Sequence, residues 1–280
     1  MAMCGFPLAH LDKYLKVLVQ EEKRFVALCE EFPVYSDNNV KEFERRIARV
    51  VTPGTLIDES FLNPLENNYL LAISPGGEVD EVAQKVGLAW IDVSTGEFFS
   101  KQSKLENVPD ELARIAPREV VLDDSFQGQP GHAIFETFAD SNCLISYAPV
   151  PPRGTVSDPE SNIDDGPALD TVLTQESIAI ELLTEFLRQN LLDHMPRLDS
   201  PLREISQDRM QIDLHTIQGL EIRGNSAYEG GSKGSLLSVI KRTNTSGGTR
   251  LLARWLCEFH VLELIPIFFD LIMQVLQVHP

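Results

Sequence analysis

The feature that most constrains the fold of this chain is a succession of apolar runs between Tyr69 and Phe126. The runs NYLLAIS and VGLAWIDVSTGEFFSKQS are broken by turn residues, and Ser94-Thr95-Gly96 predicts a tight hairpin turn. Next, VPDELARIAP predicts a short helix that ends at Pro117, and REVVLDD predicts a further strand that ends in acidic residues. Strand, hairpin, helix and strand in this order indicate an α/β domain of modest size.

The first fifty residues predict a smaller α/β unit. Leu11, Tyr14, Leu15 and Leu18 recur at helical spacing, and RFVALCE then has the apolar and β-branched content of a buried strand. We expect a strand to end within Val50–Thr55, which reads VVTPGT, because proline fixes φ while glycine supplies a conformation closed to most other residues. This string therefore marks a predicted boundary.

The C-terminal half of the chain is predicted to be largely helical. Before it, Ala148–Asp170 has five prolines and five acidic residues, which predicts an exposed loop or linker. The segment GSLLSVIKRTNTSGGTRLLARWLCEF predicts two short helices around a Gly-Gly turn. A one-sided apolar stripe at helical spacing comprises Ile178, Leu182, Leu183, Phe186, Leu187, Asn190 and Leu191.

The chain is acidic overall but has two locally basic segments. Its 280 residues are 43% hydrophobic and 24% charged, as in ordinary soluble globular proteins, and suffice to bury a core. The net charge of −18 argues against nucleic-acid binding through overall charge, because phosphate binding relies on lysine and arginine. Positive charges exceed negative ones from Lys41 to Arg49 and from Lys233 to Arg254, so nucleic-acid contact and a solvated surface both remain open.

Other residues with binding or catalytic chemistry give few signals. The four cysteines form no Cys-x-x-Cys pair and the six histidines show no metal-ligand spacing, so we expect reduced thiols and no metal site. No secretory signal is visible, and Glu263, Pro266 and Asp270 interrupt the apolar segment Val261–Val278, which argues against a membrane span. The string GGSKGS at Gly230–Ser235 lacks the glycine spacing of a phosphate-binding loop.

Three aspartates give the one enzyme hypothesis that these residues support. Asp92 lies within a predicted strand, and Asp123 with Asp124 ends a later one. In ribonuclease H-like nucleases, carboxylates at comparable places bind two metal ions that activate water. An Asp before a hairpin turn is also the expected hydrogen-bonding residue of that turn. Both interpretations stay open at this point.

Several strings resemble the MutS family in order and spacing, from Met3 to Leu256. MCGFPLAHLDKYLKVLVQEEKRFVALCEEF is similar to the family's MAGxPxHxxxxYLxxLVxxGxxVAxCEQ, and RRIARVVTPGTLIDE resembles the segment that follows it. NYLLAI, VGLAWIDVSTGEFF and ELARIAPREVVLDD resemble the strands and helix of its connector domain. MQIDLHTIQGLEI and GSLLSVIKRTNTSGGTRLLARWL resemble parts of its core, or lever, domain. The details look closest to the mitochondrial MutS homologues of fungi.

The resemblance implies an α/β plus α fold in three parts. These are a partial mixed α/β N-terminal unit, a ribonuclease H-like α/β connector domain without a nuclease site, and an incomplete helical core domain. The expected bounds are 1–54 for the C-terminal half of the mismatch-recognition domain, 55–147 for the connector, 148–170 for the acidic loop or linker, 171–257 for the start of the core and 258–280 for an atypical tail.

The resemblance also implies a function in DNA mismatch repair. The family recognises mispaired or looped-out bases in duplex DNA as a dimer, and it uses ATP with Mg to become a sliding clamp. Its Phe-x-Glu motif is expected before Met1, and its clamp and ATPase are expected beyond Leu256. We therefore expect a fragment that hydrolyses nothing and holds no cofactor itself, that has no membrane partner, and that is mitochondrial by resemblance alone.

Five residues are the candidate DNA contacts. By resemblance, Met3 belongs to a loop that lies near the DNA beside the mismatch. Lys41, Arg45, Arg46 and Arg49 are expected to meet phosphates, because basic side chains position a protein on DNA without reading sequence. Core packing for Met3 and plain surface charge for the others stay open. Two other functions also stay open: a ribonuclease H-like metal-dependent nuclease, and a protein-interaction module without DNA specificity.

Overall fold

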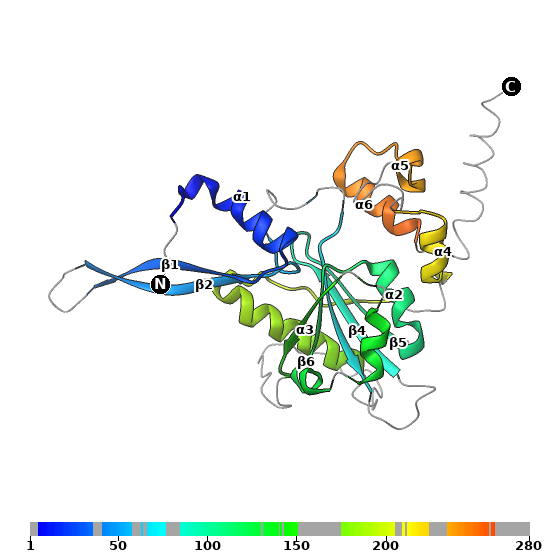
Figure 1. The fold of residues 1–280 in the computed structure, drawn as a ribbon, viewed down its shortest axis with the longest axis horizontal. Helices are drawn as coiled ribbons and strands as arrows, with labels where there is room; N and C mark the ends of the chain where they lie inside the picture. Colours follow the sequence, from blue (N-terminus) through cyan, green and yellow to red (C-terminus); the bar gives the residue numbers. More distant parts are fainter. Residues whose placement is uncertain are drawn as a thin grey trace, which may run out of the picture.

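The computed structural model describes residues 5–35, 41–57, 63, 66–76, 85–129, 131–139, 141, 143–150, 175–204, 209–210, 212–223, 234–257 and 259–260. A central mixed sheet carries helices on both faces (Figure 1). A long N-terminal hairpin projects from one side of this body, and a group of short C-terminal helices lies on the other side. Most of the predicted loop at 148–170 and most of the tail at 258–280 lie outside the described residues.

The central sheet has six strands in the order β7-β6-β3-β4-β5-β8. Strands β3, β4 and β5 form an antiparallel meander, β6 and β7 run parallel to β3 and to each other, and β8 runs parallel to β5. The predicted hairpin turn is confirmed, because the backbone N–H groups of Thr95 and Gly96 donate to the Asp92 carbonyl at 3.2 and 2.8 Å. The strands in chain order are β3 Tyr69–Pro75, β4 Lys85–Asp92, β5 Glu97–Lys104, β6 Glu119–Asp123, β7 Leu144–Ala148 and β8 Leu202–Arg203.

Alternation along the strands gives the sheet two apolar faces, so the domain has three layers. Helix α2, Val108–Ile115, and the 3₁₀ segment η5, Ala133–Phe138, cover the face that carries Leu71, Ile73 and Trp90. Helix α2 ends with Ala116 in the left-handed conformation at φ 52°, immediately before Pro117, as the sequence predicts. Three further 3₁₀ segments lie in this part of the chain: η3 Leu105–Asn107, η4 Asp124–Gly128 and η6 Leu192–His194.

Helix α3, Gln175–Leu191, covers the other face of the sheet. The predicted stripe is confirmed at Leu182, Leu183, Phe186, Leu187 and Leu191, all of which are buried. The N-terminus of α3 crosses strand β4 at Gly87, where an added Cβ would lie 1.9 Å from the carbonyl oxygen of Gln175. Glycine at this position therefore allows the helix backbone to approach the sheet backbone directly.

The N-terminal unit consists of a helical segment and the β1–β2 hairpin. Short helices η1, α1 and η2 cover Leu8–His10, Leu11–Leu15 and Lys16–Glu21, and β1, Val26–Tyr35, pairs antiparallel with β2, Lys41–Val51.

The prediction for the apolar face of this helical segment is partly wrong. Leu15 and Val19 are buried against Val51, whereas Tyr14 and Leu18 are 44% and 42% exposed. The segment turns π-helical from Lys16, and its wider turn moves Leu18 off the buried face.

The C-terminal helices are short. They are α4 Leu214–Gly219, α5 Leu236–Ile240 and α6 Ser246–Trp255, beside a two-stranded pairing of β9, Arg209–Met210, with β10, Phe259–His260. The predicted Gly-Gly turn is wrong, because Gly247 and Gly248 lie in the first turn of α6. Thr245 begins that helix by accepting a hydrogen bond from the Gly248 N–H at 3.1 Å, so capping outweighs the weak helix propensity of glycine.

Candidate nucleic-acid interface and its junctions

Four of the five candidate DNA contacts lie on one strand. These four residues belong to β2, in the hairpin that projects from the body (Figure 1): Lys41, Arg45, Arg46 and Arg49. Met3 lies outside the described residues.

The two most exposed of these arginines lie on opposite faces of the hairpin. Arg45 lies opposite Glu31 and its neighbour Arg46 lies opposite Glu30. Because adjacent residues of a strand point to opposite faces, Arg45 and Arg46 do not share one basic surface.

The exposed arginines of the hairpin are already paired with carboxylates. Arg45 donates two hydrogen bonds to Glu31 Oε1, at 3.0 and 2.8 Å, and Arg46 donates to Glu44 Oε2 at 2.5 Å. The Arg46 guanidinium also lies 6.0 Å from the centre of the Phe32 ring. Arg46 lowers the pKa of Glu44 through this hydrogen bond and its charge. A phosphate group would therefore bind these arginines by displacing their carboxylate partners. Because these ion pairs are exposed to solvent, they contribute little stability and their displacement costs little.

The VVTPGT string joins the hairpin to the central sheet. The carboxylate of Glu119, the first residue of β6, is fully buried and accepts hydrogen bonds from Thr52 Oγ1 at 2.5 Å, from the Gly54 N–H at 2.8 Å and from Ser146 Oγ. An added Cβ at Gly54 would lie 2.6 Å from Leu70 Cδ1 and 3.0 Å from Glu119 Cβ. The predicted boundary is therefore a close-packed junction built on one carboxylate.

Burial dominates the electrostatics of this junction. It raises the pKa of Glu119 above its ordinary value of 4.5, and the hydrogen bonds from Ser146, Thr52 and Gly54 offset only part of that increase. Asn68 adds a further link, because its side-chain amide donates to the Pro53 carbonyl at 3.0 Å. The sequence suggested the boundary, but it gave no sign that a glutamate 65 residues away would receive the glycine N–H.

The nuclease hypothesis for Asp92, Asp123 and Asp124 is wrong in its geometry. Asp92 is the turn residue of the alternative interpretation, because its carboxylate accepts hydrogen bonds from Ser94 N and Oγ at 3.0 and 2.5 Å. It lies opposite Tyr69 at the start of β3, whereas Asp123 ends β6 and caps the next turn by accepting from Ser125 N. Since β3 and β6 are parallel and Leu70 lies opposite Glu119, Asp92 and Asp123 lie about five residues apart along the strands, which is about 16 Å. Within the described ranges, no group of three His, Cys, Asp or Glu residues could hold a metal ion.

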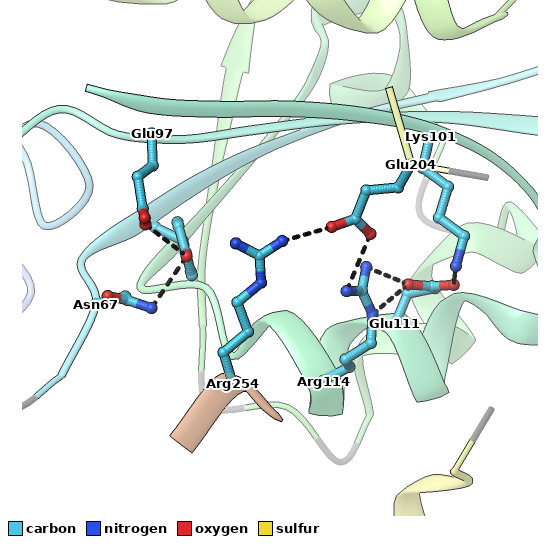
Figure 2. Close-up of polar contacts among 8 residues, drawn as sticks. Asn67, Glu97, Lys101, Glu111, Arg114, Glu204 and Arg254 are labelled. Atoms are coloured by element: carbon cyan, nitrogen blue, oxygen red, sulfur yellow. Dashed lines mark hydrogen bonds and ion pairs between the residues drawn. The ribbon is translucent and has the colours of Figure 1, made fainter. Parts of the chain in front are cut away.

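A buried chain of charges forms a second junction, between the sheet and the C-terminal helices (Figure 2). Lys101 of β5 pairs with Glu111 of α2, which also pairs with Arg114 at 2.8 Å. Arg114 pairs with Glu204 at 3.1 Å, and Glu204 pairs with Arg254 of α6 at 2.9 Å. The Lys101, Glu111 and Glu204 side chains are only 6%, 5% and 4% exposed.

Aromatic rings line this charge chain and remove it further from water. The Arg114 guanidinium carbon lies 5.2 Å from the Trp90 ring centre, and that of Arg254 lies 4.3 Å from the Phe99 ring centre. Sequence reasoning missed the whole cluster. One available signal was Glu111, which occupies an inward position of the stripe formed by Val108, Leu112 and Ile115.

None of the helices within the described ranges has both the length and the apolar character of a membrane span. The apolar segment that the sequence singles out, Val261–Val278, falls outside those ranges.

Three family models match the chain in succession. MutS domain I matches residues 1–60, MutS domain II matches 68–148 and MutS domain III matches 215–258. The second match covers five strands of the six-stranded sheet, β3 to β7, and the first covers the hairpin and the VVTPGT string that joins it to the sheet.

Bacterial proteins named DNA mismatch repair protein MutS are similar over most of the chain. The relative from Nitrobacter winogradskyi is 34% identical over 266 residues, which cover 90% of this chain and 29% of that protein. The relative from Anaplasma phagocytophilum is 31% identical over 263 residues, covering 91% of this chain and 31% of that protein. The chain thus spans less than a third of the length of these relatives. It belongs to the MutS family and carries, in order, segments of its domains I, II and III.

Proposed function

We propose that this chain works in DNA mismatch repair as part of a MutS-family protein that binds duplex DNA with mispaired or looped-out bases. The ordered succession of domains I, II and III carries the proposal, together with relatives that are named for this repair process. Because the chain spans less than a third of those relatives, the repair activity, the DNA substrate and the homodimer partner all belong to the proposal.

Within this proposal the β1–β2 hairpin contributes backbone contacts to DNA. Its projection from the body leaves Arg45 and Arg46 accessible, and each has a local glutamate partner that a phosphate can replace. Contacts of this kind fix the register of a protein on the duplex and carry no sequence information. The central sheet is then the ribonuclease H-like connector, and the two junctions hold the hairpin and the C-terminal helices to it.

The Mg-dependent ATPase site that the family resemblance implies does not fit the residues of this chain. The sequence contains no Gly-x-x-x-x-Gly-Lys-Ser/Thr string, and the described ranges contain no cluster that could hold a metal ion. We therefore derive no ATP-driven step from these residues. We also propose a mitochondrial location, from the resemblance of the sequence details to fungal mitochondrial homologues alone. Organelle fractionation with an antibody to the chain would test it.

Disruption of the gene tests the repair function most directly. We expect base-substitution and single-base frameshift mutations to accumulate faster in the disrupted strain, and the intact gene to reverse this. A gene carrying Arg45→Gln, Arg46→Gln and Arg49→Gln together should restore repair only in part. The matched control is Arg188→Gln, which removes from helix α3 an arginine that is as exposed as Arg46 and is paired with Glu185. An unchanged mutation frequency in the disrupted strain would contradict the proposal.

A further inference from the structure

Two adjoining cavities form a cleft between the end of the sheet at which β3 and β6 begin and the C-terminal helices. The smaller, of about 360 Å³, lies against α5 and α6, and the larger, of about 520 Å³, lies against α2, α4 and the start of β6. The two share a wall made by Asn63, Glu66, Asn67, Ala116 and Arg118, and we call the pair the junction cleft. Both volumes lie in the range of small-molecule sites.

The smaller lobe of the junction cleft is strongly basic. One acidic residue, Glu66, lines it and pairs with Arg118, while Arg254 pairs with Glu204. The other three cations of its lining are Arg223, Lys241 and Arg250, for which the described part of the chain supplies no ion-pair partner. In a chain with a net charge of −18, three such cations around one cavity leave a concentrated positive charge.

Two polar atoms of the same lobe lack hydrogen-bond partners. Asn67 Oδ1 and Arg223 Nε are shielded from solvent and make no hydrogen bond. Buried polar atoms are rarely left so, because each costs the free energy of its lost hydration. The Arg223 Nε–H group requires an acceptor and Asn67 Oδ1 requires a donor. A ligand that satisfies both presents an anionic oxygen beside a hydroxyl or amine group.

We propose that the junction cleft binds a phosphorylated small molecule. Its phosphate lies among Arg223, Lys241 and Arg250, and a donor group of the ligand reaches Asn67. Arginine and lysine around a single cavity favour phosphate oxygens, since phosphate carries more charge and more acceptor sites than a carboxylate. Nucleotides and inorganic pyrophosphate share this chemistry, and the larger lobe offers room for a nucleoside.

The test is calorimetric titration of the 280-residue chain at physiological salt with pyrophosphate, with ATP in the absence of Mg, and with adenosine. We expect pyrophosphate and ATP to bind and adenosine to fail. Lys241→Gln with Arg250→Gln should weaken phosphate binding by about tenfold for each lost charge-assisted contact. If ATP binds more tightly than pyrophosphate, the ligand of the cleft is a nucleotide. If ATP and pyrophosphate bind equally, the ligand is an inorganic phosphate compound.

Matched variants separate binding from folding. Arg242→Gln removes an exposed neighbouring cation outside the cleft lining and should leave the affinity unchanged. Lys241→Arg with Arg250→Lys keeps both charges and should retain binding. Absence of binding below about 1 mM for both phosphate compounds would overturn the proposal. The proposal would also be overturned if the variant with Lys241→Gln and Arg250→Gln bound pyrophosphate and ATP as the wild type does, or if that variant lost only the binding of duplex DNA. Because Arg45, Arg46 and Arg49 of the hairpin do not line the cleft, these outcomes do not depend on the repair function.

Discussion

Gly54 and Glu119 together decide how the N-terminal unit meets the central sheet. The glycine brings its N–H group to the buried carboxylate, and the carboxylate also holds Thr52 and Ser146. Only a residue without a side chain leaves room for Leu70 in this turn. The VVTPGT string is thus explained by a contact between residues that lie 65 positions apart.

Replacement of Glu119 should change how stability depends on pH. Burial raises the pKa of Glu119 in the folded state, so the native protein binds more protons than the unfolded chain above the ordinary pKa of 4.5. The contribution of Glu119 to the free energy of unfolding has its full value below that pH, and it decreases as pH rises toward the raised pKa. Glu119→Gln removes this dependence, so the variant should gain stability relative to wild type as pH rises above about 4.5.

Urea unfolding at several pH values measures this difference. Glu119→Ala is the comparison: it removes the same titrating group, but it also leaves the donors of Thr52, Gly54 and Ser146 without an acceptor. It should therefore be about 2–4 kcal/mol less stable than Glu119→Gln at every pH. If the free energies of unfolding of wild type and Glu119→Gln changed with pH in parallel, this carboxyl group would not titrate as described.

Substitution of Gly54 by alanine should destabilise the protein by about 1–3 kcal/mol, because the new Cβ would overlap Leu70 Cδ1 at 2.6 Å. Gly131→Ala is the matched control, since an added Cβ there meets no atom within 4 Å, and it should change stability by less than about 0.5 kcal/mol. Thermal unfolding of the two variants compares them. Equal midpoints would mean that the junction has more space than the contacts indicate.

At the scale of elements, the buried charge chain fastens strand β5 and helix α2 to helix α6. It contains three cations and two carboxylates, most of them removed from water, and each carboxylate serves two partners. A buried pair adds little net stability over apolar residues, but loss of one member leaves its partners uncompensated. The chain of charges therefore acts chiefly by fixing where α6 lies against the sheet.

Glu204→Gln should destabilise this junction by about 3 kcal/mol, because it leaves Arg114 and Arg254 without their shared carboxylate. Glu185→Gln, which breaks the exposed pair with Arg188, should cost less than about 1 kcal/mol. The two tryptophans report separately, since Trp90 lies in the core and Trp255 ends α6 half-exposed.

Urea unfolding of two double variants follows each tryptophan alone. Trp90 reports in Glu204→Gln with Trp255→Phe, and Trp255 reports in Glu204→Gln with Trp90→Phe. We expect the Trp255 transition to occur at a lower urea concentration than the Trp90 transition. Coincident transitions with unchanged stability would show that the charge chain does not hold α6.

The elements that the sequence predicts well are those with local signals. Alternating apolar runs, Asp92 before a turn and Ala116-Pro117 after a helix each act within a few residues, and the structure confirms the strands, the hairpin turn and the end of α2. The site-forming contacts join residues far apart, such as Gly54 with Glu119 and Glu204 with Arg254, and no local pattern encodes them. The π-helical turn and the cap at Thr245 were missed because a competing local hydrogen bond outweighed apolar spacing or glycine content.

At the scale of the whole molecule, a chain with a net charge of −18 is expected to bind DNA only through a local surface. The three-layer domain keeps the hairpin and the C-terminal helices on different sides, each held by its own junction (Figure 1). The hairpin is the element of domain I that places several arginines away from the body. We propose that these arginines position the protein on the DNA backbone.

Fluorescence anisotropy of the 280-residue chain, titrated against a short duplex with and without one G·T mismatch over a salt series, tests this claim most directly. Because the hairpin contacts are basic side chains, the account predicts equal affinity for both duplexes, falling as salt rises. Substitution of Arg45, Arg46 and Arg49 by glutamine should lower the slope of log K against log salt by about 0.9 for each lost phosphate contact, and Arg188→Gln should leave it unchanged. An unchanged slope in the triple variant would contradict this role for the arginines.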